Sequence, residues 1–206
     1  MTIEIGTSDF RTQAGQVDGV FIEPVKYYFD RLKQLTQERS RALTRRDELA
    51  EDPTTHFENV AISDYEGEVD MVFMDDEQIA AQSLPQWVRG CNTMNEIHPS
   101  VKRVMQERGE DGAFFTKQKV KVVRIKSIID KYNITSLDLL KIDTEGHDCI
   151  ILNDYLNTVE ILPQVIQFEA NILSDPKEVQ KVVDRLGPLG YECKQVKDDM
   201  ICQLIT

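Results

Sequence analysis

A group of acidic and polar side chains follows a predicted buried strand in the second half of the chain. Residues 137–142 read Leu-Asp-Leu-Leu-Lys-Ile, and Asp143, Glu145 and His147 come directly after this run. An open α/β sheet carries its chemistry at the carboxyl ends of its strands. Carboxylates there can hold a cation or take up a proton, and a histidine can act as a base near neutral pH. We therefore expect Asp143, Glu145 and His147 to be the catalytic residues.

Part of this group also has a plainer interpretation. Gly146 breaks the strand, and Ile150 and Ile151 open an apolar pattern that predicts a helix behind it. At the start of such a helix, His147 can equally make a local hydrogen bond. Asp148 is interpreted as a residue that begins the helix.

A second apolar run, residues 163–168, also ends in polar side chains, Glu169 and Asn171. If its strand is a neighbour of the first, these two residues converge with Asp143 and Glu145 on one cleft, and Asp143, Glu169 and Asn171 are the candidate metal ligands. Hard oxygen ligands of this kind suit Mg²⁺, and a metal there could orient and acidify a substrate hydroxyl. Alternatively, the acids bind the ammonium group of a cofactor or serve as a general base.

The beginning of the chain predicts a cofactor site. Glu4 and Gly6 end the first strand, and Glu23 ends the second. The glycine allows close approach of a cofactor, and the second acid can accept hydrogen bonds from a ribose. A nucleotide-dependent oxidoreductase normally has a glycine-rich phosphate loop here, whereas this chain continues with Thr7 and Ser8. The pattern favours a nucleoside cofactor without phosphates, S-adenosylmethionine, in contact with these residues.

The elements that position these residues alternate between strands and helices, which indicates a doubly wound α/β sheet. The closing pair of strands, joined at Lys197–Asp199, resembles the end of the seven-stranded sheet of class I methyltransferases. We expect a Rossmann-like, mostly parallel seven-stranded sheet with helices on both faces and an antiparallel last strand. Predicted strands span residues 2–5, 19–23, 57–63, 68–73, 120–123, 137–142, 163–169, 191–196 and 200–205.

An irregular insertion interrupts this alternation at residues 75–118. It contains the only tryptophan and several polar side chains, namely Trp87, Arg89, Asn92, Asn95 and His98, and a turn is expected at 110–112. A long excursion inside a compact domain is usually a lid or a substrate-recognition element, although a surface decoration is the alternative.

Composition predicts a single domain over residues 1–206. With 41% hydrophobic and 29% charged residues, the chain is typical of globular proteins, and it has neither a membrane span nor a signal layout. We expect a cytoplasmic protein whose four cysteines are reduced thiols, because they form no metal-binding or C-x-x-C spacing. The net charge of -12 argues against a nucleic acid partner.

The order of motifs resembles the FkbM-type methyltransferases over residues 3 to about 192. Lys-Ile-Asp-x-Glu-Gly is the most specific segment, followed by Asn-x-Ala-Ile-Ser-Asp with its later glycine. The segments that carry the resemblance are residues 3–6, 21–24, 59–64 with Gly67, 140–146, and 168–169.

The resemblance implies an S-adenosylmethionine-dependent O-methyltransferase acting on a small molecule or glycan. Glu4 and Gly6 would line the methionine end of the cofactor, and Glu23 would hold the ribose. Asp143 and Glu145 would lie at the reaction centre. The adenine would be bordered by Ala61 and Ser63.

Two departures from the family affect how the cofactor is held. The first loop lacks the further glycine that the family usually has, and the chain begins at its first strand. We therefore expect the site to be more open, or to be closed by residues 75–118 or by a second subunit of a homo-oligomer. A non-catalytic protein that binds S-adenosylmethionine is a further alternative, since one sequence cannot prove activity.

Overall fold

The computed structural model describes residues 1–8, 10–44, 53–94, 96–109 and 115–205. Its main sheet has seven strands in the order β10-β11-β9-β8-β1-β2-β3. All neighbours are parallel except β11, which runs antiparallel to β9 and β10. The predicted Rossmann-like sheet is therefore confirmed. Its strands are β1 (Thr2–Ile5), β2 (Gly19–Ile22), β3 (Thr55–Glu58), β8 (Leu139–Ile142), β9 (Val165–Glu169), β10 (Tyr191–Val196) and β11 (Asp199–Leu204).

The register of the central strands brings their carboxyl ends to one edge. Ile5 of β1 is paired with Ile142 of β8, which is paired with Phe168 of β9. All three side chains are buried, as expected for central strands that are covered on both faces. The residues that follow them in sequence, Gly6, Asp143 and Glu169, must consequently lie side by side.

Helices cover both faces of this sheet, because alternate residues of a strand point to opposite sides. Val20 and Ile22 of β2 belong to the core that α4, α5 and α6 complete. Phe21 between them packs instead with Leu32 of α1. These helices are α1 (Lys26–Thr44), α4 (Ile125–Lys131), α5 (Asp148–Thr158) and α6 (Pro176–Leu186), followed by the short η2 (Gly187–Leu189).

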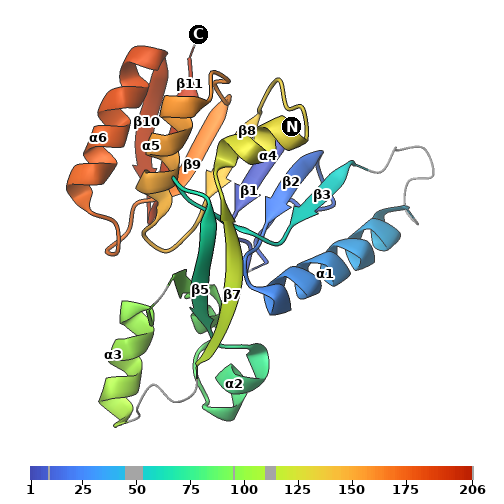
Figure 1. The fold of residues 1–206 in the computed structure, drawn as a ribbon, viewed down its shortest axis with the longest axis vertical. Coiled ribbons are helices and arrows are strands. Elements are labelled where there is room, and N and C mark those ends of the chain that lie inside the picture. The colour runs from blue at the N-terminus through green and yellow to red at the C-terminus, as the bar shows by residue number, and fades with distance from the viewer. Residues whose placement is uncertain (9, 45–52, 95, 110–114, 206) are drawn as a thin grey trace.

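A second, four-stranded sheet in the order β4-β7-β5-β6 extends away from the main sheet. In Figure 1 its long strands β5 and β7 reach toward α2 and α3 at the far end. We call β5, β7 and everything between them the lobe. The lobe consists of β5 (Gly67–Phe73), α2 (Asp76–Ala81), η1 (Gln86–Gly90), β6 (Thr93–Met94), α3 (Pro99–Arg108) and β7 (Thr116–Val123). The remaining strand of the second sheet, β4 (Ala61–Ile62), precedes the lobe in sequence.

The predicted irregular insertion at 75–118 is more regular than expected. Two helices and a helical turn bury a small apolar cluster that includes Ile79, Val88 and Met105. The pattern is hard to detect in the sequence because α2 has only six residues and η1 five. Asn95 and the turn predicted at 110–112 lie outside the described residues.

The expectation of four reduced cysteines was wrong for two of them. Cys193 and Cys202 occupy directly opposite positions in the β10–β11 hairpin and form a disulfide. Their pairing depends on the strand register, which cysteine spacing alone does not reveal. Within the described part of the chain, the helices are all too short or too polar to cross a bilayer. A cytoplasmic location stays a prediction.

Candidate active site

Two cavities meet at the carboxyl edge of the main sheet. The first has a volume of about 290 Å³ and the second about 790 Å³. The residues that line both come from three separate segments: Gly6 and Ser8 after β1, Asp143 and Glu145 after β8, and Gly90 from the lobe. The predicted reaction centre therefore forms the wall between two chambers.

Glu23 is the buried acid of the first cavity. Its carboxylate is 1% exposed and accepts backbone hydrogen bonds from Thr7 N at 3.2 Å and Val25 N at 2.9 Å. Asn59 fixes the adjoining backbone by donating to the carbonyl oxygens of residues 23 and 24. Because each carboxylate oxygen has two lone pairs, Glu23 can accept further hydrogen bonds from a ligand. Ala61, also buried, lines the same cavity.

Gly6 is required by the close approach of β1 to β8. Its φ of +83° lies in the left-handed region, and a Cβ atom built on it would lie 1.8 Å from the carbonyl oxygen of Asp143. No side chain fits in that space. The backbone crosses over the end of β8 here, which brings residues 6–8 against the acidic segment.

Three residues that line the cavities have a buried polar atom without a hydrogen-bond partner. Among the described residues, these atoms are Asn92 Oδ1 in the first cavity and Glu4 Oε2 and Glu169 Oε2 in the second. Thr7 Oγ1, between Gly6 and Ser8 in sequence, also lacks a partner. Leaving buried polar atoms unpaired is costly, so native proteins rarely do so without a ligand or water. Glu4 is held by accepting from Gln13 N through its other oxygen at 2.9 Å. These oxygen atoms are mainly acceptors, and the Thr7 hydroxyl can also donate, so they fit a polar ligand that brings hydrogen-bond donors and an acceptor.

Three carboxylates converge at the wall. Asp143, Glu145 and Glu169 can each present an oxygen atom within 4.8 Å of the others. Burial, followed by the charges of Glu145 and Asp143, raises the pKa of Glu169 to about 9. Without a cation, Glu169 is therefore protonated at neutral pH. Asn171 does not share this arrangement, because its Oδ1 accepts a hydrogen bond from Leu173 N at 2.7 Å.

Asp148 has a larger role than its sequence position indicated. The side chain is 1% exposed, and its Oδ1 accepts from Glu169 N at 3.0 Å. Its Oδ2 accepts from both the hydroxyl and the backbone N–H of Thr144, at 2.8 and 3.3 Å. Burial raises the pKa of Asp148. This carboxylate ties the end of β9 to the loop after β8 and so holds the three acids together.

His147 lies on the side of the first cavity. Its Nε2 is 2.9 Å from the hydroxyl oxygen of Ser63, which is fully buried and donates to Asp64 at 3.1 Å. Because the Ser63 hydroxyl has one proton, Nε2 donates to it. Burial lowers the pKa of His147, which favours the neutral form of the ring. Its predicted catalytic role stays a prediction, and so does the contact of Ser63 with a cofactor.

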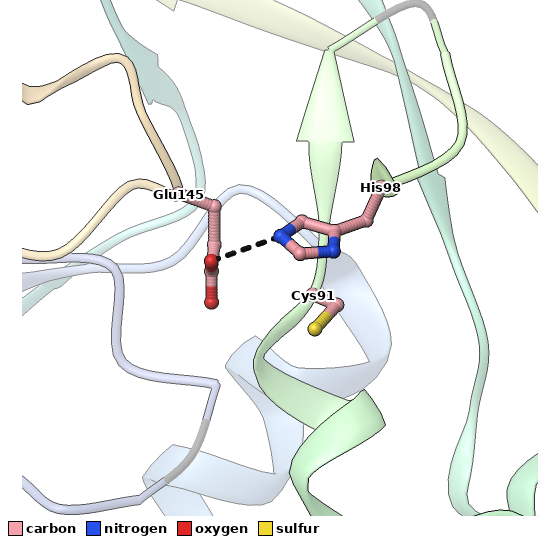
Figure 2. A group of neighbouring side chains, drawn as sticks. All are labelled: Cys91, His98 and Glu145. Carbon is pink, nitrogen blue, oxygen red and sulfur yellow. Dashed lines mark hydrogen bonds and ion pairs between the residues drawn. The ribbon is translucent and has the colours of Figure 1, made fainter. Parts of the chain in front are cut away.

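The lobe contributes to both chambers. Asn92 lines the first, whereas Trp87 and Arg89 line the second. Figure 2 shows His98 from the start of α3 with its ring directed at the Glu145 carboxylate. The sequence analysis placed these four residues in the insertion at 75–118, but it predicted no contact for any of them. Only the folded structure brings them to the ends of β1 and β8.

The architecture is that of a Rossmann-like methyltransferase, and comparison with known proteins identifies the family. Residues 5–193 match the sequence model of the methyltransferase FkbM domain, so the chain belongs to the FkbM methyltransferase family. A crystal structure of methyltransferase FkbM from Methylobacillus flagellatus KT superimposes with a TM-score of 0.57 at 11% sequence identity. The match covers 98% of this chain and 43% of that one, so this chain spans less than half of its length. No protein of curated function matches the chain significantly.

Proposed function

We propose that the protein transfers a methyl group from S-adenosylmethionine to a hydroxyl oxygen of a small molecule or glycan. The observation that supports this most is the wall shared by the two cavities. Direct transfer needs donor and acceptor aligned a few ångströms apart, and two chambers that meet at one set of residues provide that alignment.

The first cavity is assigned to the nucleoside part of the cofactor. Glu23 accepts hydrogen bonds from the ribose, beside the two that it receives from the backbone. Ala61 leaves room for the adenine. Glu4 lines the second cavity, so the methionine end of the cofactor would reach past the wall toward it. Glu4 Oε2 and Thr7 Oγ1, both buried without a partner, suit the ammonium and carboxylate groups of that end. The bound cofactor would thus provide the hydrogen-bond partners that these two buried atoms lack.

The acids at the wall have separate tasks in this proposal. When bound, S-adenosylmethionine supplies a methyl carbon whose bond to sulfur breaks as the acceptor oxygen attacks it in line. Glu145 takes the proton of the acceptor hydroxyl, with Asp143 beside it. Glu169 is already protonated at neutral pH and is suited to donate a hydrogen bond rather than to act as a base. His147 is the alternative base.

A magnesium ion at the wall is an optional part of the proposal. The spacing of Asp143, Glu145 and Glu169 fits a cation that prefers oxygen ligands, although Asn171 is used elsewhere. A metal there would acidify the acceptor hydroxyl. Loss of turnover with EDTA and recovery with Mg²⁺ would support it, whereas turnover that is indifferent to EDTA would exclude it.

The cofactor is tested by calorimetric titration and thermal shift. We expect S-adenosylmethionine and S-adenosylhomocysteine to bind, and NADH and NADPH not to bind. Glu23→Gln should weaken S-adenosylhomocysteine binding, whereas Glu192→Gln, on the exposed side of β10, should leave it unchanged. Binding of a nicotinamide nucleotide alone would favour an oxidoreductase instead.

The reaction is tested with a methyl-labelled cofactor and a panel of hydroxyl-bearing small molecules and glycans. Label should enter an oxygen of the acceptor, and Glu145→Gln and Asp143→Asn should slow transfer by about 100-fold or more, as expected for loss of a general base. If Asp143→Ala, Glu145→Ala and His147→Ala each kept full turnover, the assignment of the base would be wrong. Cofactor binding without transfer to any acceptor would indicate a non-catalytic binding protein.

A further inference from the structure

A buried histidine of the lobe holds the side chain of Glu145. His98 is 3% exposed, and its Nε2 lies 3.1 Å from Glu145 Oε2 (Figure 2). The residues are 47 positions apart, and they come from different parts of the fold: the start of α3 and the loop after β8.

The tautomer of His98 follows from its second ring nitrogen. Ser100 N–H donates to His98 Nδ1 at 3.2 Å, which caps the N-terminus of α3. Nδ1 therefore has a lone pair rather than a proton. In the neutral ring the proton is then on Nε2, which donates it to Glu145.

Glu145 needs such support because its backbone is in an unfavourable region. Its φ of 55° is left-handed, which is uncommon for a residue other than glycine. Strained positions of this kind persist when surrounding contacts hold them, and they are frequent at active sites. The bond from His98 restricts the side chain of Glu145 at the boundary of the two cavities.

We propose that His98 is a positioning residue for methyl transfer, which orients the Glu145 carboxylate from the lobe. The task of Glu145 rests on the proposed function, but the contact and its tautomer do not. The lobe then does more than line the second cavity. The way it packs against the main sheet determines the direction in which the Glu145 carboxylate points.

A metal site is the rival interpretation of the same residues. Cys91, His98 and Glu145 can place one ligand atom each within 4.8 Å of one another, a nitrogen, sulfur and oxygen set that suits Zn²⁺. However, a metal on Nε2 would move the ring proton to Nδ1, where it would meet the Ser100 N–H.

Two substitutions separate the tasks of the two ring nitrogens. His98→Asn keeps an oxygen near the position of Nδ1 and so keeps the helix cap, but it removes the donor to Glu145. His98→Gln places an amide N–H near the position of Nε2 and loses the cap. With an acceptor found in the panel, His98→Asn should lower kcat about tenfold or more, and His98→Gln should retain most of it. S-adenosylhomocysteine affinity should stay within about twofold in both, because the bond acts on orientation rather than on cofactor contacts.

Nuclear magnetic resonance tests the contact without any acceptor. The chain has only three histidines, so long-range ¹H–¹⁵N spectra can assign each ring. We expect the neutral ring of His98 to be in the Nε2–H form, with a shift of its Nε2–H signal in Glu145→Gln. Either an Nδ1–H form or an unchanged signal in Glu145→Gln would overturn the proposal.

Three further outcomes decide whether His98 orients Glu145, binds a metal or only stabilises the fold. Stoichiometric Zn²⁺ that is lost in Cys91→Ser but kept in Cys149→Ser would make His98 a metal ligand and overturn the proposal. Equal loss of kcat in His98→Asn and His98→Gln would mean that His98 acts only through the fold. Failure to find an acceptor would count against the proposed function, whereas the tautomer would still be established by the spectra.

Discussion

Gly6→Ala tests the close crossing of β1 over β8. The alanine must adopt a left-handed conformation, which costs about 1–2 kcal/mol. Its Cβ atom would lie 1.8 Å from the carbonyl oxygen of Asp143, so the two segments must separate by more than 1 Å to reach an allowed contact. That movement breaks the hydrogen bonds from Gly6 N to Ile22 O and from Asp143 N to Ile5 O, at 3.0 and 2.9 Å. Each is worth about 1 kcal/mol.

The expected loss is therefore about 3–4 kcal/mol of unfolding free energy, or about 10 °C in Tm for a domain of this size. Urea denaturation followed by circular dichroism measures the loss directly. Gly187→Ala is the matched control, because Gly187 has helical angles and open space around its Cβ position. It should be neutral or slightly stabilising. A Tm of Gly6→Ala within about 2 °C of the unmodified protein would refute the reasoning.

Three further predictions concern the buried acids and the closing hairpin. Burial among other carboxylates raises the pKa of Glu169 from 4.5 to about 9, so its contribution to stability is present at acidic pH and lost as pH rises through that window. Tm of the ligand-free protein should fall from pH 5 to 9, and less steeply in Glu169→Gln; equal slopes would contradict this. In Asp148→Asn, the amide NH2 group must face the backbone N–H of either Glu169 or Thr144, so one hydrogen bond is lost. We expect the unfolding free energy from urea denaturation to fall by about 1–3 kcal/mol. An unchanged midpoint would show that the carboxylate is not needed there. Reduction of the bond between Cys193 and Cys202, which lie 9 residues apart, should cost at most about 2.5 kcal/mol, and the double alanine variant should be insensitive to reductant.

The sequence allowed prediction of the strand ends because buried parallel strands have a simple signature. Glu23, Asp143 and Glu169 each follow an apolar run, and the carboxyl ends of neighbouring parallel strands meet at one edge. The mostly parallel seven-stranded sheet and its antiparallel last strand followed from the same alternation, together with the resemblance to methyltransferases. Gly6 was identified by its place after β1, but its close approach to the Asp143 carbonyl oxygen, which excludes a side chain, is visible only in the folded structure.

Contacts between distant segments could not be predicted in the same way. His98 and Glu145 lie 47 residues apart, and no periodic pattern links the start of α3 to the loop after β8. Asp148 was assigned a local role because a carboxylate at a helix start is common, while its bond to Glu169 N depends on how β8 and β9 are paired. The disulfide depends in the same way on the register of a hairpin.

The common wall of the two cavities has a consequence for ligand design. Under the proposed function, a single molecule that joins an adenosine-like group to an acceptor-like group across Gly6, Ser8 and Glu145 would occupy both cavities at once. The second group would then bind at a high effective concentration, so affinity would increase without any new contact. The best linker length would measure the distance between donor and acceptor, and the acceptor fragment that gives the tightest compound would indicate which substrates the second chamber selects.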